Sequence, residues 1–417
     1  MPQIDSIETI VSQGLCIGCG LCESLAGKQT LEMGITSYGQ MRPHVKRSVE
    51  PEVMEQIKQI CPGISVTGPN KEQVRDKGTM DTVWGPIRSL HRGWMSDESR
   101  RYHAAAGGSL TGFGIYLLQS GKVDAIVHVR ASLSDPMLTD AHVSTTIEEV
   151  VSGAQSRYGP AAPLVHVHRL LDEGRRFAVI GKPCDMAAIR NLARIDARVE
   201  TQIPYCLTIF CGGLPTSHTA RKIAEYYGVK ADDVEVFRFR GNGWPGPTHI
   251  KAKDGRVFER TYEATWQDRT TPWKYDIQFR CKICPDAIGE LGDVACPDGW
   301  IMRDGRPIHE EAPGVNILVA RTARGEALVR EAAQAGIMEL APFDRSEFET
   351  MHGDQFPRKL QNGVRLAAIK VAGYSVPSFT NFRLLGSLFK AGLSQIIGGF
   401  FGTLRRVRAG ANQEPLR

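Results

Sequence analysis

The segment Arg176-Phe-Ala-Val-Ile180-Gly-Lys-Pro-Cys184 decides the fold prediction. Its apolar run has the length of a strand, and a run with helical character follows from Met186 to Leu192. Residues 203–210 repeat the plan, with an apolar strand, then Cys211-Gly-Gly, then a helix expected from about Ser217. Strands that alternate with helices predict an α/β fold with a partly parallel sheet.

Further patterns extend this architecture on both sides. The spacing of apolar residues predicts a helix at 109–119 and a buried strand at 124–129. One more unit pairs a strand at 315–320 with a helix at 326–335. A chain of 417 residues is roughly two to three times the usual domain size, so we expect more than one core.

The first group of cysteines is Cys16-Ile-Gly-Cys19-Gly-Leu-Cys22, completed by Cys61-Pro62. Three closely spaced cysteines with a distant Cys-Pro are typical of half of a bacterial two-cluster ferredoxin. Glycines between the ligands permit the sharp turns that a chain wrapping a cluster must make. The alternative is structural zinc, which prefers two separated cysteine pairs. We therefore expect Cys16, Cys19, Cys22 and Cys61 to hold a 4Fe–4S cluster.

The second group is less local. Cys281-Lys-Ile-Cys284 alone fits zinc, a redox dithiol or a cluster. Cys184 and Cys211 each follow an apolar strand and are expected to open a helix, which places both at the carboxyl edge of the sheet. A helix N-terminus stabilises a thiolate there. We expect these four cysteines to hold a second 4Fe–4S cluster. Cys206 reads as a buried strand residue, and Cys296-Pro297 is the foremost substitute ligand.

Composition and charge limit the partners and the cellular location that are expected for this chain. A net charge of +5 does not point to nucleic acid, although a basic face could steer an acidic electron carrier. The first ten residues carry Asp5 and Glu8 without the apolar core of a signal peptide, and no run reaches the roughly 18 apolar residues of a membrane span. A cytoplasmic location is expected, where clustered thiols usually indicate metal.

Taken together, these motifs and several others resemble the coenzyme F420 hydrogenase/dehydrogenase beta-subunit family, which includes 7-hydroxymethyl chlorophyll a reductase. The resemblance covers roughly residues 10–335 in family order. One departure is Pro297-Asp298-Gly299-Trp300, where family members usually have Gly-Asp-Ala-Trp. Besides the N-terminal cysteine motif, the matching stretches are Ala106-Gly107-Gly108-Ser109, Val123-Asp124-Ala125-Ile126-Val127, Ser156-Arg157-Tyr158, Gly181-Lys182-Pro183-Cys184, Phe210-Cys211-Gly212-Gly213, Phe239-Arg240-Gly241 and Cys281-Lys282-Ile283-Cys284-Pro285-Asp286.

The resemblance implies FAD as a cofactor and an electron path from a donor through two 4Fe–4S clusters to the flavin. Glycines before a helix also allow backbone N–H groups to approach a pyrophosphate, and cationic side chains can neutralise its charge. Without the family context, a plain helix cap is the favoured explanation of Gly107-Gly108-Ser109. The implied flavin contacts are Gly107, Gly108, Ser109, Thr111, Ser156, Arg157, Tyr158, Lys182 and Arg240.

Four regions are expected on this interpretation. Residues 1–75 form a small ferredoxin-like 4Fe–4S module, and an FAD-binding α/β body with a partly parallel sheet follows. Residues 76–165 supply the N-terminal part of the flavin domain, and residues 166–345 supply the C-terminal part with the second cluster. Residues 346–417 form a basic, partly amphipathic tail.

The favoured function is an oxidoreductase that takes electrons from a low-potential donor, expected to be ferredoxin, and reduces an organic substrate at FAD. One alternative is an electron-transfer beta subunit of a hydrogenase or dehydrogenase complex, and another is a coenzyme F420 oxidoreductase. The fused ferredoxin-like module favours the stand-alone reductase. The sequence names neither the substrate nor a proton donor, and it leaves open a homo-oligomer or a partner subunit.

Two further patterns need an interpretation. Gly241-Asn-Gly243-Trp-Pro-Gly246 matches a dinucleotide fingerprint, but Pro245 and the strand-like residues after it predict a turn between strands. The tail from Phe379 to Arg408 interleaves apolar residues with glycines and ends in arginines. It could lie on a membrane surface, or pack on its own domain or on a second subunit.

Overall fold

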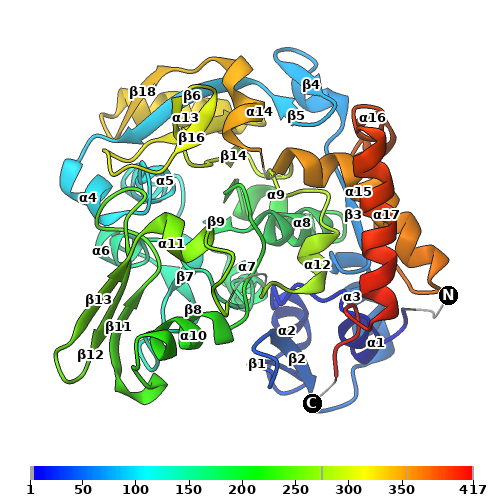
Figure 1. The fold of residues 1–417 in the computed structure, drawn as a ribbon. Coiled ribbons are helices and arrows are strands. Elements are labelled where there is room, and N and C mark those ends of the chain that lie inside the picture. The colour runs from blue at the N-terminus through cyan, green and yellow to red at the C-terminus, as the bar shows by residue number, and fades with distance from the viewer. Residues whose placement is uncertain (1–3, 274–275, 354, 416–417) are drawn as a thin grey trace.

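A mixed eight-stranded sheet forms the centre of the molecule (Figure 1). The computed structural model describes residues 4–273, 276–353 and 355–415. The four inner strands β14, β10, β9 and β7 are parallel, and antiparallel strands flank them on both sides. This confirms the α/β class and the partly parallel sheet. In spatial order the strands are β18 (Met338–Pro342), β6 (Ser89–Met95), β17 (Asn316–Ala320), β14 (Val294–Ala295), β10 (Tyr205–Thr208), β9 (Phe177–Gly181), β7 (Ala125–Ala131) and β8 (Thr139–Ser144).

Alternating side chains divide the core between the two faces of this sheet. In β9, Phe177 and Val179 pack into one cluster while Ala178 packs into another. The helix α8 (Pro183–Leu192) covers the first face. The helices α5 (Ser109–Gln119) and α13 (Ala323–Gln334) cover the second. The predicted helix at 109–119 is therefore confirmed over its full length.

The N-terminal segment packs directly on the first face. Ile17, Leu21 and Ile60 share a buried cluster with Leu164 and Met186 of the body. The predicted boundary near residue 75 stays a prediction, although the core is continuous across it. The elements of this segment are α1 (Ile7–Ser12), α2 (Leu21–Ala26), the antiparallel pair β1 (Leu31–Ile35) and β2 (Met41–Val45), α3 (Pro51–Ile60) and β3 (Ser65–Thr67).

The C-terminal segment is a folded part of the molecule. Its long helices α15 (Gln355–Val371) and α17 (Leu393–Arg408) lie side by side along one edge (Figure 1). Its strand β19 (Ser378–Thr380) pairs in parallel with β3 of the N-terminal segment. One face of the segment thus packs on its own chain, which was one of the outcomes left open by the sequence. The short helices α14 (Phe348–Met351) and α16 (Leu384–Leu388) complete it.

A second, antiparallel sheet carries the turn that resembled a dinucleotide fingerprint. Residues 241–246 connect β11 (Val234–Arg238) to β12 (Thr248–Ala252), with β13 (Val257–Arg260) beside them and α10 (His218–Tyr226) packed nearby. The prediction of a turn between strands is confirmed. Among the residues described, none of the helices combines the length and the apolar character that crossing a bilayer requires. The remaining elements are η1 (Lys71–Val74), β4 (Thr79–Asp81), β5 (Gly85–Ile87), α4 (Glu98–His103), α6 (Ile147–Ser152), α7 (Val167–Asp172), α9 (Arg198–Gln202), η2 (Ala231–Asp233), α11 (Tyr262–Trp266), α12 (Phe279–Lys282), β15 (Ile301–Arg303), β16 (Arg306–Ile308) and η3 (Arg345–Glu347).

Candidate functional site

The first four cysteines come together in the fold. Cys16, Cys19 and Cys22 lie on the loop that enters α2 and in its first turn, and Cys61 follows α3 directly. Burial raises the pKa of Cys19 well above its usual value, and the nearby Cys22 and Cys61 raise it further. Burial likewise raises the pKa of Cys61 to about 12, with Cys16 adding to the effect. Each thiol is therefore within electrostatic reach of others in the set.

Backbone geometry shows why glycines separate these cysteines. Gly18 and Gly20 have φ values of +74° and +84°, in the left-handed region that disfavours other residues. A Cβ on Gly18 would also lie 2.6 Å from the carbonyl oxygen of Met41. The turn aims the Gly18 N–H at the Cys16 sulfur, with 3.4 Å between nitrogen and sulfur. The expected role of the glycines in turning the chain is confirmed.

The second four cysteines also form one group, assembled from three distant segments. In the parallel pair β9–β10, Gly181 is opposite Thr208, and Cys184 and Cys211 each follow three residues later. Burial, with the nearby Cys281 and Cys284 adding to it, raises the pKa of Cys211 to about 12. The pKa of Cys184 is raised by burial and, among other charges, by Cys211 and Cys284.

One detail of the sequence interpretation is wrong. Cys184 lies in the first turn of α8, as expected, but Cys211 does not open a helix, because α10 begins only at His218. Cys211 instead lies in an irregular loop that Leu214 and Gly213 also occupy. Backbone donors from this loop replace the helix N-terminus: the Gly213 N–H bonds to Cys211, and the Leu214 N–H donates to the Cys281 sulfur at 3.3 Å.

The two remaining cysteines stand apart from both sets. Cys296 follows β14 at the same edge of the sheet, and its N–H donates to the Thr208 carbonyl at 2.8 Å. Its side chain packs into the cluster of the opposite face, and burial is the cause that raises its pKa. Cys206 is fully buried in β10, as expected. Cys296 therefore lies outside the group formed by the second set.

Arg42 connects the two sets of cysteines. Burial lowers the pKa of Arg42, but the charges of Cys16, Glu414 and Cys281 outweigh it and raise the pKa. Its guanidinium donates to both carboxylate oxygens of Glu414, at 2.6 and 2.7 Å, and to the Gln278 side chain at 3.0 Å. One cation thus interacts with a thiol of each set.

Arg280 makes a second connection. Burial raises the pKa of both Cys61 and Cys284, and Arg280 lowers the pKa of each. Arg280 lies in α12, beside Cys281 of the second set. Its guanidinium donates to the carbonyl of Pro62, next to Cys61 of the first set, at 3.1 Å.

Asp185 makes a third connection between the two sets of cysteines. Its charge raises the pKa of Cys19 and of Cys184, in both cases behind the larger effect of burial. Its side chain is fully buried and pairs with Lys182 at 2.8 Å between Nζ and Oδ2. Three different side chains therefore each reach both sets, so the two sets are neighbours in the structure.

The C-terminal segment supports both sets, which sequence reasoning missed. Lys359 of α15 donates to the Pro285 carbonyl at 3.1 Å, and Arg365 donates to the Lys282 carbonyl at 2.9 Å. These contacts fix the loop that carries Cys281 and Cys284. Their absence from the sequence prediction has a simple cause, since nothing in a basic helix indicates which loop it will contact.

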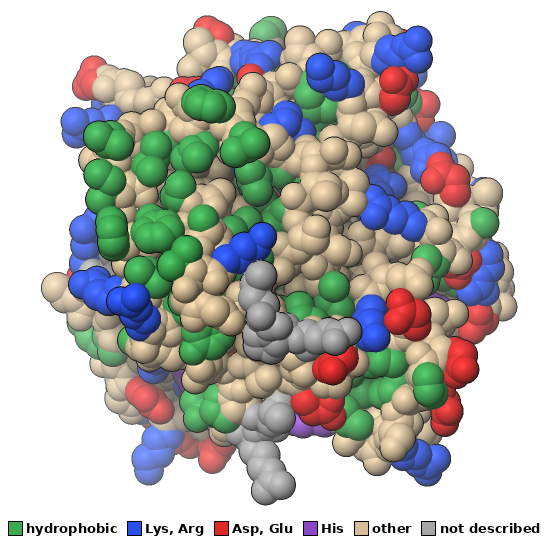
Figure 2. All heavy atoms as spheres, turned by 90° about the vertical axis from the view of Figure 1, so that its right-hand side faces the viewer, with side chains coloured by type: hydrophobic (Ala, Val, Ile, Leu, Met, Phe, Trp, Pro, Cys, Tyr) green, Lys and Arg blue, Asp and Glu red, His purple; other side chains and the backbone are tan. Residues whose placement is uncertain are grey.

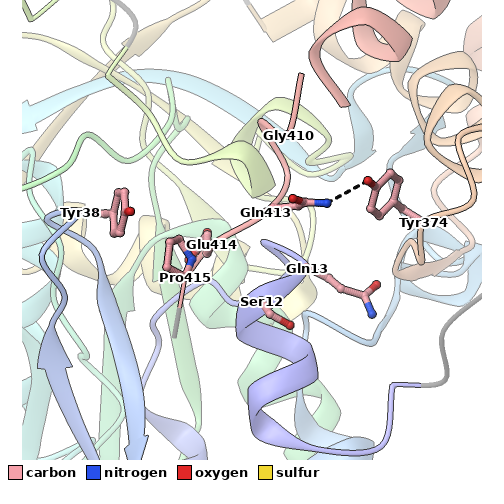
Figure 3. A pocket seen from close by; sticks show the side chains of 8 residues that line it. All are labelled: Ser12, Gln13, Tyr38, Tyr374, Gly410, Gln413, Glu414 and Pro415. Atoms are coloured by element: carbon pink, nitrogen blue, oxygen red, sulfur yellow. Dashed lines mark hydrogen bonds between the residues drawn. The ribbon is translucent and has the colours of Figure 1, made fainter. Parts of the chain in front are cut away.

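The end of the same segment crosses α1 beside a hollow of about 610 Å³ (Figure 3). There the Gln413 side chain donates to the Tyr374 hydroxyl at 2.9 Å, and the Glu414 N–H donates to the Ser12 carbonyl. These bonds place the Glu414 carboxylate against Arg42.

The residues expected to contact flavin are only partly brought together. Gly108 is the N-cap of α5 with a φ of +72°, and a Cβ on Gly107 would lie 2.6 Å from the Gly93 carbonyl oxygen. The Ser109 N–H donates to the Asn316 side chain at 3.3 Å. Close packing inside the protein therefore already requires these glycines. Thr111 lies in the first turn of the same helix.

Arg240 gathers a second subset. It forms a two-pronged ion pair with Asp298, at 2.9 and 3.1 Å, and donates to the Tyr158 hydroxyl at 3.2 Å. Ser156 pairs with Arg240 through an isolated bridge. Asp298, from the stretch that departs from the family pattern, already balances the charge of Arg240. Lys182 lies elsewhere, with the Cys184 and Cys211 charges acting on it.

Arg157 stands out because its charge is not balanced. Burial and, to a smaller extent, the charge of Arg238 together lower the pKa of Arg157 to about 10. Both arginines line a hollow of about 300 Å³, together with Gln155, Ser132 and Glu235, whose carboxylate pairs with Lys251. Within the described part of the chain, neither forms an ion pair, and the Nε of each is buried without a hydrogen-bond partner. The sequence analysis did not identify Arg238. The pattern Arg238-Phe-Arg240, with two arginines separated by a single residue, could have indicated it.

The donor sets decide which groups the site could hold. Buried thiols whose pKa is raised by one another need a cationic partner to ionise, and soft thiolates suit iron–sulfur clusters or zinc. The described residues contain no group of three or more His, Cys, Asp or Glu side chains arranged to hold a single metal ion. The Arg157–Arg238 pair suits an anion such as the diphosphate of FAD. The residues present therefore fit both kinds of cofactor.

The fold and site define a class: an α/β protein in which two adjacent sets of four partly buried cysteines, and a hollow lined by two arginines, lie around a mixed sheet. Two family models match the chain, and both describe the beta subunit of coenzyme F420 hydrogenase/dehydrogenase. The model of its N-terminal part matches residues 90–169, and the model of its C-terminal part matches residues 174–346. The chain belongs to this family, as the resemblance predicted.

Individual relatives of this chain agree with the family assignment. The chain is 28% identical to the coenzyme F420 hydrogenase subunit beta of Methanococcus voltae, over 60% of this chain and 82% of the relative. It is 24% identical to the F420-dependent formate dehydrogenase 1 subunit beta of Methanococcus maripaludis, over 58% of this chain and 59% of that one. A chain of the F420-reducing [NiFe] hydrogenase complex from Methanosarcina barkeri shares the fold, with a TM-score of 0.56, 18% identity, and coverage of 73% of this chain and 99% of that one.

These relatives are oxidoreductase subunits by name, which supports an oxidoreductase role for this chain. They fit the alternative of a beta subunit within a larger complex better than the stand-alone reductase that the fused N-terminal module had favoured.

Proposed function

We propose that this chain is an electron-transferring subunit of an oxidoreductase, holding two 4Fe–4S clusters and FAD. The observation that carries the proposal is the adjacency of the two cysteine sets, each within reach of Arg42, Arg280 and Asp185. Electron transfer between two centres requires them to be close, and a structural role for either set would not.

When bound, the clusters supply one-electron chemistry and the flavin converts between one- and two-electron chemistry. The protein's own groups do the rest. Partial burial limits the access of water to the thiolates. Backbone N–H groups from Gly18, Gly213 and Leu214 stabilise negative charge on sulfur. Arg42 and Arg280 stabilise the additional negative charge that reduction brings, since each lies near a thiolate of both sets.

The flavin proposal rests on Arg157 and Arg238. Among the described residues neither arginine forms an ion pair, although the charge of Glu259 acts on Arg238, and partly buried cations of this kind carry a cost that a bound diphosphate would relieve. Gly107, Gly108, Ser109, Thr111, Ser156, Tyr158, Lys182 and Arg240 remain proposed flavin contacts on the strength of the family resemblance.

The partner follows from the named relatives. We propose that the electron partner is the catalytic component of a hydrogenase or dehydrogenase, with coenzyme F420 or ferredoxin as the soluble carrier. Anaerobic assays of the purified chain with reduced ferredoxin and with reduced F420 separate the two carriers, because reduction of bound flavin is visible in absorbance. A chain that accepts electrons from neither, with flavin bound, contradicts the proposal.

Cofactor analysis tests the proposal first. Anaerobically purified protein should hold about eight iron and eight acid-labile sulfide atoms, with one FAD. Cys296→Ala is the matched control, because Cys296 is a buried cysteine at the same edge of the sheet whose side chain packs on the opposite face. It should keep the full iron content. About four iron atoms with zinc in the remaining site would contradict the second cluster, and a flavin-free protein would contradict the FAD site.

A further inference from the structure

A row of exposed apolar side chains runs along α16 and α17. Its members, spaced four residues apart, have exposed fractions between 50% and 90%. Single exposed apolar residues are ordinary, but a continuous row marks an interaction surface. We call it the apolar strip; Figure 2 shows apolar side chains gathered on this side of the molecule. It consists of Leu385, Phe389, Leu393, Ile397 and Phe401.

The inner face of α17 is already in use. Gly399, Leu404 and Val407 are buried, and a Cβ on Gly399 would lie 3.2 Å from Val364 of α15. The helix is therefore held on the body with the apolar strip turned outward. A helix that is apolar on both sides is expected to be covered on both.

Within the segment that carries the strip, the charged side chains have one sign, although Asp81 from another element is within electrostatic reach of Lys390. From Gln355 to Gln413 the sequence has nine Lys and Arg residues and no Asp or Glu. Lys390 lies between the two helices, and Arg405 and Arg408 continue the exposed face of α17 beyond Phe401. Among the described residues, none of these three forms an ion pair.

The strip also lies outside the part of the chain that defines the family. The family models end at residue 346. Its partner is therefore not required to be the electron-transfer partner proposed above.

We propose that the apolar strip docks on the surface of a lipid bilayer that carries anionic headgroups. The apolar side chains enter the boundary of the acyl region while Lys390, Arg405 and Arg408 meet the headgroups. A bilayer supplies both an apolar phase and negative charge. A second copy of this chain fits less well, because it brings the same cations and no carboxylate on the strip to meet them. With 16 residues, α17 presents a contact about 24 Å long.

Flotation of the full-length, cofactor-loaded protein with vesicles tests this. The vesicles are pure phosphatidylcholine, or phosphatidylcholine with about one third phosphatidylglycerol. The protein should float with the anionic vesicles and at least tenfold less with the neutral ones. Raising the salt concentration should weaken the binding.

Variants locate the contact. Phe389→Gln combined with Leu393→Gln should reduce partitioning at least tenfold, and Arg405→Gln with Arg408→Gln should reduce it by a similar factor on anionic vesicles. Leu133→Gln is the matched control, because Leu133 is equally exposed at 83% and lies away from the strip. Because these positions are exposed, the substitutions should leave the fold and the visible spectrum of the protein unchanged.

Three results would overturn the proposal. One is no flotation with anionic vesicles, and another is flotation that the strip variants do not change. The third is a concentration-dependent dimer that disappears in Phe389→Gln/Leu393→Gln without any lipid binding, which assigns the strip to a second copy of the chain.

Discussion

Each of the two cysteine sets brings four thiols together, but the chain does so in a different way in each set. The first is largely local, because three of its members lie within seven residues and the fourth follows the next long helix. The second is assembled by topology: parallel strands bring Cys184 and Cys211 to one edge, and a distant loop adds Cys281 and Cys284. The first set depends on glycine turns, and the second depends on the whole sheet and on the C-terminal helix that supports its loop.

This difference has a consequence for stability. Loss of the first set removes a constraint from one segment, whereas loss of the second separates three segments that meet only in the folded protein. Structural metal sites contribute on the order of 10 kcal/mol to folding. The second set should therefore contribute more to stability than the first, and substitutions in the two sets should differ in kind.

The largest effect is expected from Cys284→Ala. It should lower the iron content to about half and also lower the melting temperature strongly, because the loop, β9 and β10 lose their common anchor. Iron analysis and thermal unfolding measure both. Cys296→Ala, also buried, should leave the iron content unchanged. If Cys284→Ala kept all its iron while Cys296→Ala lost half, Cys296 would be the ligand.

Cys19→Ala should have a narrower effect. It should lose about half of the iron and electron entry from a protein donor, yet keep FAD and its reduction by dithionite, because the flavin residues and the second set lie on the body. Absorbance during anaerobic titration follows both. Full donor-linked reduction in this variant would show that the N-terminal set is structural.

A smaller change is expected from Arg157→Gln. A hydrogen bond to a charged group contributes about 1.5–3 kcal/mol, so FAD affinity should fall roughly 10- to 100-fold with the iron content unchanged. Equilibrium dialysis of FAD measures this. Arg256→Gln, an exposed arginine paired with Asp254, is the control. Equal flavin affinity in the two variants would remove Arg157 from the site.

The smallest effect concerns the connection between the sets. Arg280→Gln removes a positive charge near Cys61 and Cys284. Unit charges roughly 8 Å apart interact by about 2 kcal/mol at an effective dielectric constant near 20, so the reduction potentials should fall by tens of millivolts. Redox titration should show both clusters shifted in Arg280→Gln and neither in Arg280→Lys. A shift of one cluster alone would place Arg280 with that set only.

The two cysteine sets also differ in how well the sequence predicted them. Spacing alone predicted the first set, because three of its four cysteines are close along the chain. The second set needed the argument that Cys184 and Cys211 both follow parallel strands, and the register of β9 and β10 confirms that placement. Cys296 was a substitute candidate because Cys-Pro is also typical of cluster ligands, and the sequence could not tell that its side chain packs on the opposite face.

Side chains that connect distant segments were beyond prediction. Arg42, Arg280 and Asp185 lie near one set in sequence, and only the packing of the N-terminal segment on the sheet brings them to the other. Glu414 and Lys359 come from a region that composition described as a basic tail. The helix expected from about Ser217 is confirmed by α10. Only the expectation that Cys211 itself opens that helix is wrong, since a Gly-Gly pair after a strand indicates a turn without fixing its length.

The electron paramagnetic resonance spectrum of the fully reduced protein tests the adjacency of the two sets most directly. Two reduced clusters that are neighbours interact magnetically, because dipolar coupling falls with the cube of distance. The spectrum of the intact protein should therefore be broadened and split, and Cys19→Ala should reduce it to the simple signal of one cluster. A spectrum of the intact protein that equals the sum of two independent signals would contradict the account.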